Sequence, residues 1–200
     1  GEQGTVVLYH GNAGSACDRA FLAERFKQAG WGYLLPEYAG YSNDEQKPSH
    51  ELIKQDVRNV IDYLESQATG TVAIMGVSIG TGVASYHTSL APPDRLLLIS
   101  PFTDLVAVAR DRFWFYPTSF LVDNAYDNVI NLSNYQGQVV VVHGAKDTII
   151  DPRLSQALYD SLATDKKTRH VVDDRGHNDV FLDPETFAIL TQFLIVSDEQ

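Results

Sequence analysis

A chain of 200 residues in which 44% are hydrophobic and 20% charged is long enough for one domain with a full core. Its 26 acidic residues outnumber 15 basic ones and give a formal net charge of −11. This balance argues against a nucleic-acid partner, because phosphate binding requires clustered basic side chains. No stretch reaches the roughly 20 apolar residues of a membrane span. We therefore expect a single domain over 1–200.

Short apolar runs alternate with amphipathic or small-residue segments along the chain. The predicted strands cover 5–9, 31–35, 71–75, 95–100, 138–143 and 168–172, and the predicted helices cover 16–29, 49–64, 80–89, 152–162 and 184–195. Strands that are apolar throughout are typical of a mostly parallel sheet with helices on both faces. The aromatic segment 101–136 is predicted to form short helices of a small cap.

The stretch 71–89 has the pattern of a strand, a tight turn and a helix, with Ser78 on the turn between Gly76 and Gly80. A serine on such a turn has a strained backbone, and the flanking glycines let the strand and the helix approach closely. The N–H groups at the start of the helix can then stabilise an oxyanion beside Ser78. Because this motif also arises by chance, the rest of the chain has to support it.

Other polar clusters also follow predicted strands, at 10–14, 100–102, Asp147 and His177. The active site of a parallel sheet lies at the carboxyl ends of its strands. A serine becomes a nucleophile when a histidine takes its proton and a carboxylate orients that histidine. The order Ser78, Asp147, His177 is the order found in α/β-hydrolases, so these three are the predicted catalytic residues.

Other carboxylates compete with Asp147 for this role. Asp151 precedes a proline and is interpreted as a helix cap. Asp173 and Asp174 are too close in sequence to His177 to be the usual strand-end carboxylate. Asp179 is interpreted as a supporting or solvated group.

Six motifs occur in order over nearly the whole chain: HGNAG at 10–14, PEYAGYS at 36–42, GVSIG at 76–80, SPFTD at 100–104, HGAKDTIIDP at 143–152 and GHND at 176–179. In these residues the chain resembles the α/β-hydrolase superfamily, within it the compact serine hydrolases that include depalmitoylase-like and prolyl-oligopeptidase-like enzymes. The resemblance implies the α/β-hydrolase fold, cleavage of carboxyl esters or thioesters through an acyl-enzyme on Ser78, and no cofactor. It also implies an antiparallel hairpin before the first strand. Since the chain starts at Gly1, we expect that an N-terminal segment, such as an anchor or signal, has been removed.

The expected oxyanion donors are the backbone N–H of Ile79 and that of Asn12 or Ala13 in the glycine-rich turn. Aromatic residues of a cap either fill the core or line an acyl pocket, and the sequence leaves both readings open. The residues expected to border the substrate are Tyr41, Phe102, Trp114, Phe115 and Phe120.

Histidines and the single cysteine offer other chemistry. His10 and His143 each follow a strand, but the closely spaced ligands of a metal site are missing, so no metal is expected. We expect both to brace loops by hydrogen bonds. Cys17 is expected to be a buried structural cysteine. The remaining helix and strand histidines are expected at the surface: His50, His87 and His170.

Two other functions stay open. An aminopeptidase or oligopeptidase with the same triad would need an acidic group for the substrate amine, which Glu37 or Asp44 could supply. A non-catalytic binding module is also compatible with a hydrolase scaffold, although no triad residue is lost. The expected substrate is a small-molecule or acylated-protein ester, and the compartment and oligomeric state are left open.

Overall fold

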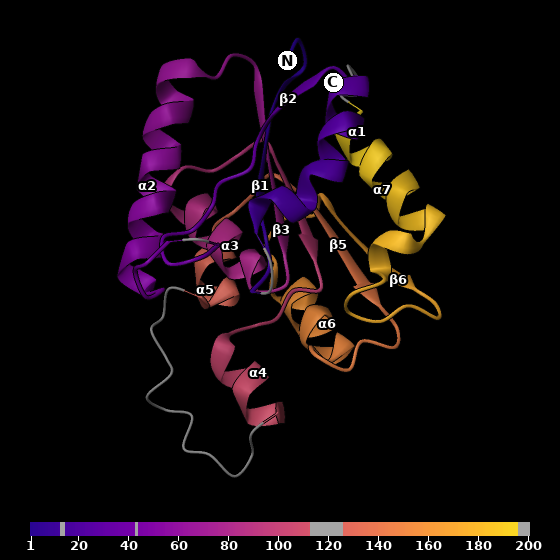
Figure 1. The fold of residues 1–200 in the computed structure, drawn as a ribbon. Coiled ribbons are helices and arrows are strands. Elements are labelled where there is room, and N and C mark those ends of the chain that lie inside the picture. The colour runs from indigo at the N-terminus through magenta and orange to yellow at the C-terminus, as the bar shows by residue number, and fades with distance from the viewer. Residues whose placement is uncertain (13–14, 43, 113–125, 196–200) are drawn as a thin grey trace.

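Six strands form one sheet, which confirms the predicted α/β architecture. The computed structural model describes residues 1–12, 15–42, 44–112 and 126–195. All strand pairs in these residues are parallel, in the order β2-β1-β3-β4-β5-β6 (Figure 1). The strands are β1 Gly4–Tyr9, β2 Trp31–Leu34, β3 Thr71–Val77, β4 Arg95–Ile99, β5 Gln138–Gly144 and β6 Lys167–Val172.

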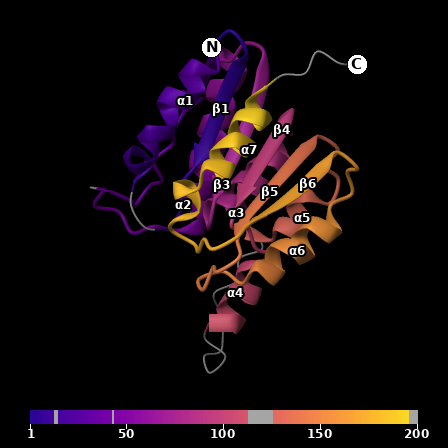
Figure 2. The same cartoon turned by 90° about the vertical axis from the view of Figure 1, so that its right-hand side faces the viewer.

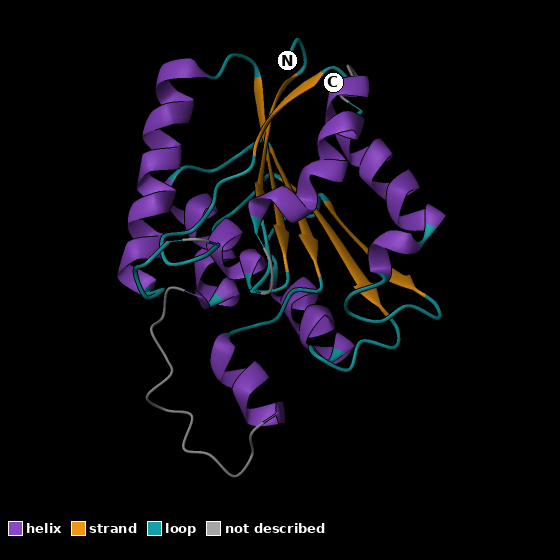
Figure 3. Ribbon diagram, viewed as in Figure 1, coloured by secondary structure: helices purple, strands orange, loops and turns teal. Residues whose placement is uncertain are grey.

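Helices cover both faces of the sheet, as Figures 2 and 3 show. One face carries α1 Ala23–Gln28 and α7 Pro184–Leu194, and the other carries α2 His50–Gln67, α3 Gly80–Leu90, α5 Asn128–Leu132 and α6 Pro152–Ser161. The predicted N-caps of α2 and α6 are confirmed, since Ser49 accepts the N–H of Leu52 and Asp151 accepts that of Arg153. In the described residues no helix is long and apolar enough to cross a membrane.

The sheet separates two hydrophobic cores. Alternate residues of a strand point to opposite faces, so Val7 of β1 packs with α2 and α3, whereas Val6 packs with α1 and α7. Each fully buried aliphatic side chain contributes about 1.5–3 kcal/mol. On the α1–α7 face, the guanidinium of Arg25 lies 3.8 Å from the ring centroid of Phe187. These two cores hold the carboxyl ends of the strands, and with them the site, in register.

Three expectations are wrong near the first and third helices. The predicted helix 16–29 begins as a 3-10 helix, Ala16–Leu22, before α1. Cys17 on this turn is exposed rather than buried. His87 is 1% exposed, because α3 is lined by small residues and is covered on nearly all sides. Burial lowers the pKa of His87 to about 4, and its Nδ1 lies 2.7 Å from the Tyr9 hydroxyl.

The predicted cap region begins beyond the carboxyl ends of the strands, where α4, Leu105–Arg112, projects (Figure 1). The chain returns at Asn128, which is fully buried and anchors this region to the sheet. Its Nδ2 donates to the carbonyl of Phe102 at 2.8 Å, and its Oδ1 accepts the hydroxyl of Ser85 at 2.6 Å. The backbone N–H of Asn128 donates to Thr103, so both ends of the segment 104–127 meet at one place.

Candidate active site

Ser78 lies on a strained turn between β3 and α3. Its φ angle is 56°, in the left-handed region that side chains other than glycine rarely adopt. The turn is held by the Ser78 N–H, which donates to the Ile99 carbonyl at 2.9 Å. A Cβ at Gly80 would collide with the carbonyl oxygens of Tyr9 and His10, so only glycine lets α3 begin this close to the end of β1. The backbone thus presents the Ser78 side chain at the carboxyl edge of the sheet.

The structure brings together Ser78, His177 and Asp147, the three predicted catalytic residues. His177 Nε2 lies 2.8 Å from Ser78 Oγ, and His177 Nδ1 lies 2.7 Å from Asp147 Oδ2. Because a carboxylate only accepts, Nδ1 carries the proton and Nε2 is free to accept the serine proton. The arrangement can therefore activate a serine hydroxyl.

The Asp147 carboxylate is held by several donors. Its Oδ1 accepts the N–H of Ile149 at 2.8 Å and that of Ile150 at 2.9 Å. Its Oδ2 faces His177 and also lies 3.1 Å from Nε2 of His143. Burial alone would raise the pKa of Asp147, but hydrogen bonds from His143, His177 and Ile150 outweigh it and hold that pKa well below its usual range. Asp147 is therefore ionised near neutral pH.

The loop that carries His177 packs directly on the end of β5. The Lys146 N–H donates to the Arg175 carbonyl at 2.7 Å. A Cβ at Gly144 would lie 2.5 Å from that carbonyl oxygen, so a side chain there would push the loop away. Asp179 has a supporting role, since its Oδ1 accepts the N–H of Gly176 at 2.6 Å.

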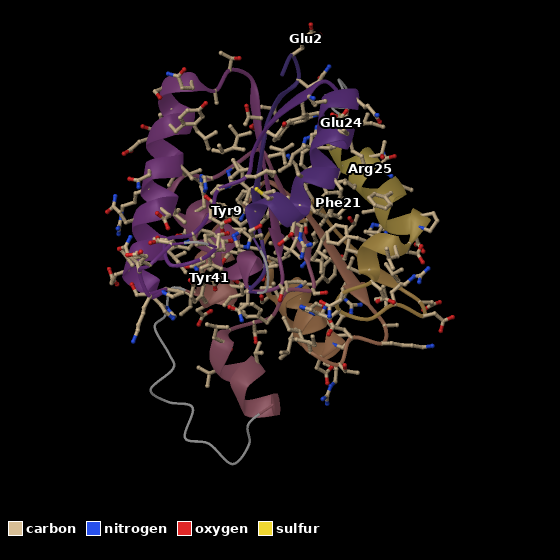
Figure 4. The ribbon with its side chains drawn as sticks, in the orientation of Figure 1. Glu2, Tyr9, Phe21, Glu24, Arg25 and Tyr41 are labelled. Carbon is tan, nitrogen blue, oxygen red and sulfur yellow. The ribbon has the colours of Figure 1, made fainter. Side chains whose placement is uncertain are left out.

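The other side of Ser78 is formed by the loop after β1. A Cβ built at Gly11 would lie 3.4 Å from Cβ of Ser78, which places this loop beside the nucleophile. Asn12, an expected oxyanion donor, is exposed, and its Oδ1 accepts the Tyr41 hydroxyl at 2.8 Å. Figure 4 shows Tyr41 on the side of the sheet that carries α2 and α3. The other expected donors are Ile79, which follows Ser78 at the start of α3, and Ala13, which lies outside the described residues.

Glu37 connects the loop after β1 with its own loop by hydrogen bonds, a role that the sequence analysis missed. Its Oε2 accepts the Ala16 N–H at 3.0 Å and the Ser42 hydroxyl at 2.7 Å. Its Oε1 lies 2.9 Å from Nε2 of the buried His10. Partial burial would raise the pKa of Glu37, but the hydrogen bonds from Ser42 and Ala16 lower it overall. In the sequence, Glu37 stands in the PEYAGYS motif and was considered only as an acidic group for a substrate amine.

The remaining expectations have mixed outcomes. Phe102 is 1% exposed and packs in the core, which contradicts its expected place on a substrate pocket. Trp114, Phe115 and Phe120 lie outside the described residues. His10 and His143 do brace loops, through the carbonyl of Gly11 and that of Ile150. Over the described part of the chain, no group of three or more His, Cys, Asp or Glu could hold a metal ion.

Comparison with known sequences gives related proteins over most of the chain. An uncharacterised protein of Mycobacterium tuberculosis is 32% identical over 177 residues, which are 87% of this chain and 63% of the relative. The lysophosphatidylserine lipase ABHD12 of Xenopus tropicalis is 28% identical over 226 residues, which are 98% of this chain and 58% of the lipase. The chain thus spans less than two thirds of the length of these relatives.

Solved structures show the same fold at low identity. The monoacylglycerol lipase of Paleococcus ferrophilus superposes with a TM-score of 0.73 at 18% identity, over 95% of this chain and 93% of the lipase. The esterase EaEST of Exiguobacterium antarcticum has a TM-score of 0.69 at 16% identity, over 95% of this chain and 91% of the esterase. The family model described as serine hydrolase (FSH1) matches residues 25–178. The chain therefore belongs to the serine hydrolase (FSH1) family and has the α/β-hydrolase fold.

Proposed function

We propose that this protein hydrolyses carboxyl esters through an acyl-enzyme on Ser78. The observation that carries the proposal is the continuous relay from Ser78 Oγ to His177 Nε2 at 2.8 Å and from His177 Nδ1 to Asp147 Oδ2 at 2.7 Å. Ser78 itself has a strained backbone, and the chain belongs to the serine hydrolase family. These features together support nucleophilic catalysis.

In the first half of the reaction, His177 Nε2 takes the hydroxyl proton as Ser78 Oγ attacks the ester carbonyl. The negative charge on the carbonyl oxygen is stabilised by the N–H of Ile79 and by an N–H of the loop after Gly11. His177 then gives the proton to the leaving alcohol, and the acyl group stays on Ser78. Asp147 remains ionised and stabilises the positive charge on His177.

In the second half, water replaces the alcohol. His177 takes a proton from the water, whose oxygen attacks the acyl carbon, and Ser78 leaves with that proton. The free acid is released and the starting state is restored. Every proton therefore moves through His177 Nε2.

The proposed substrate is an ester with one acyl chain. The support is that relatives over nearly the whole chain are named lysophosphatidylserine lipases. A thioester passes through the same acyl-enzyme and is the second substrate to measure. Neither acidic group considered for an aminopeptidase is free in this structure, because Glu37 accepts from Ala16 and Ser42, and Asp44 accepts from Gly40 and Gln46. The ester is therefore favoured over the peptide.

The test compares hydrolysis of a p-nitrophenyl ester chain-length series, lysophosphatidylserine, an acyl thioester and aminoacyl p-nitroanilides. We expect ester hydrolysis by the wild type and a loss of about 10⁶-fold in kcat for Ser78→Ala. Ser100→Ala is the matched control, since Ser100 directly follows the neighbouring strand β4 with a φ of 50° and its buried hydroxyl has no partner in the described structure. Ester turnover in Ser78→Ala near that of the control would contradict the mechanism. Faster cleavage of the anilides than of any ester would contradict the substrate.

A further inference from the structure

A second histidine, His143 at the end of β5, contacts the Asp147 carboxylate from the side opposite to solvent. We propose that His143 is a positioning residue, which fixes the plane of this carboxylate and through it the direction of His177. The proposal rests on the proposed function of the triad. Within the described residues, the side chain of His143 contacts the Ile150 carbonyl and the Asp147 carboxylate and not Ser78 or His177, so its effect passes through Asp147.

The hydrogen-bond partners of His143 define its tautomer. Nε2 lies 3.0 Å from the carbonyl oxygen of Ile150 and 3.1 Å from Asp147 Oδ2. Both oxygens can only accept, so Nε2 carries the proton. The ring is fully buried, and its Nδ1 has no partner among the described residues. His143 therefore serves as an N–H donor on one edge only.

An unpartnered buried nitrogen is unfavourable, and an apolar side chain would fill the same space without it. What a histidine adds at position 143 is the Nε2–H directed at Asp147 and at the turn behind it. The same proton faces the Ile150 carbonyl, while the Ile150 N–H donates to Asp147 Oδ1 at 2.9 Å. His143 thus closes the turn 147–150 around the carboxylate.

The two carboxylate oxygens are held from different directions. Oδ1 accepts the two backbone N–H groups of Ile149 and Ile150. Oδ2 faces both His177 Nδ1 and His143 Nε2. Without His143, only His177 would hold Oδ2, and His177 is the group that must itself be oriented. His143 gives Oδ2 a second neighbour, which is fully buried at the end of β5.

Three substitutions at one position separate this role from packing. His143→Leu removes the donor, His143→Asn keeps a polar side chain that is too short, and His143→Gln carries an amide N–H to about the place of Nε2. We expect kcat to fall about 10- to 100-fold in the Leu and Asn variants with KM unchanged, the range found when groups behind a functional residue are removed. We expect His143→Gln to regain most of the loss.

His87→Leu is the matched control, because His87 is also a buried histidine with one side-chain partner, the Tyr9 hydroxyl. We expect His87→Leu to lower the melting temperature about as much as His143→Leu does and to leave kcat of the folded enzyme near wild type. If His143→Leu fails to fold, the Gln and Asn variants carry the comparison. Equal kcat in the Gln and Asn variants, or a kcat loss in His87→Leu as large as at position 143, would overturn the positioning role.

A readout independent of turnover is the low-field proton resonance of the His177 Nδ1–H in the hydrogen bond to Asp147. We expect it to shift or broaden in His143→Leu and His143→Asn, and to stay in place in His143→Gln and His87→Leu. If the wild type hydrolyses no ester but the resonance responds in this pattern, the function fails and the positioning role stands. If esters are hydrolysed and neither kcat nor the resonance changes at position 143, the positioning role fails and the function stands.

Discussion

The acid–base side of the candidate site, with Asp147 and His177 after β5 and β6, differs from the oxyanion side, with residues 10–16 after β1, in what holds it. Asp147 is 6% exposed and is surrounded by donors from its own turn and from β5. Asn12 is exposed, and its loop is fixed by side chains of another loop, above all Glu37 and Tyr41.

This difference has a consequence for the reaction. In the proposed mechanism the base, His177, must keep one geometry to accept and return a proton, and the carboxylate that supports it is buried and has several donors. The proposed oxyanion side must admit the substrate, and two of its supporting hydrogen bonds, from Ser42 to Glu37 and from Tyr41 to Asn12, are exposed, where single contacts contribute little. Substitutions should therefore cost more on the acid–base side than on the oxyanion side.

The largest effect should come from Asp147→Asn. An amide cannot stabilise the positive charge on His177 and can select the wrong tautomer, so we expect kcat to fall about 10³- to 10⁴-fold. Steady-state ester hydrolysis measures it. Asp151→Asn is the control from the same loop, since Asp151 caps α6 and pairs with Arg153 and has no hydrogen bond to His177 in the described residues. Equal losses in the two variants would contradict the assignment of the orienting carboxylate.

Gly144→Ala should have the next largest effect, because the new Cβ would displace the loop that carries His177. A misplacement of about 1 Å can lower the rate about 10²-fold. We therefore expect kcat to fall about 10- to 100-fold. Gly176→Ala provides a graded comparison, since a Cβ there would meet the Lys146 carbonyl at the longer distance of 3.3 Å. A larger loss at 176 than at 144 would show that this packing does not set the position of His177.

Glu37→Ala tests the oxyanion side. The loss of its contacts to Ala16, Ser42 and His10 should loosen the loop and lower kcat about tenfold, less than at Asp147. Glu45→Ala removes an exposed acid from the segment between β2 and α2, which also carries Glu37, and should leave kcat unchanged. A loss at Glu37 as large as that of Asp147→Asn would remove the difference between the two sides.

Lowering the pH should reduce the unfolding free energy of the wild type more than that of the Asp147→Asn variant. Because the pKa of Asp147 is held below its ordinary value, the unfolded chain takes up this proton first, and the stabilisation is lost as the pH falls from about 5 toward the lowered pKa. We expect the difference in unfolding free energy between the two proteins to shrink by about 1–2 kcal/mol between pH 7 and pH 3. Urea unfolding at both values checks this. A constant difference would mean that the carboxylate is not held in its ionised form by the fold.

Tyr41→Phe should have the smallest effect. It removes one exposed hydrogen bond, from the Tyr41 hydroxyl to Asn12, and leaves the ring packed near Tyr38. We expect kcat/KM to fall about twofold in the same ester assay, in line with the small net contribution of an exposed hydrogen bond. A loss above that of Glu37→Ala would place the main support of this loop at Tyr41 instead.

Most of the fold could be predicted because most of its strands are short apolar runs, such as β1, β3 and β5, and these three are followed by or end in glycine-containing turns. The order of Ser78, Asp147 and His177 along the chain was also visible, since each follows a predicted strand. What the sequence could not show was which side chains meet across the fold. Glu37 was considered only for binding a substrate amine and His143 only as a loop brace, and the folded chain shows that Glu37 contacts His10 and His143 contacts Asp147.

The errors arise where the sequence does not show how a residue is packed. His87 stands in a helix of small residues whose periodicity does not separate a buried from an exposed face, and only its packing shows that it is covered. Phe102 could have belonged to the core or to a pocket, and its contacts place it in the core. Cys17 was expected to be buried because free cysteines usually are, but it lies exposed on the first turn of the 3-10 helix.

The most direct test of the triad is labelling of the folded protein with a fluorophosphonate, followed by intact mass measurement and peptide mapping. Such a reagent modifies a serine only when a base has activated it. The account predicts one adduct per chain, on Ser78. In His177→Ala the labelling rate should fall by at least the same factor as the rate of ester hydrolysis. A folded wild-type protein without an adduct, or with its adduct on another residue, would contradict it.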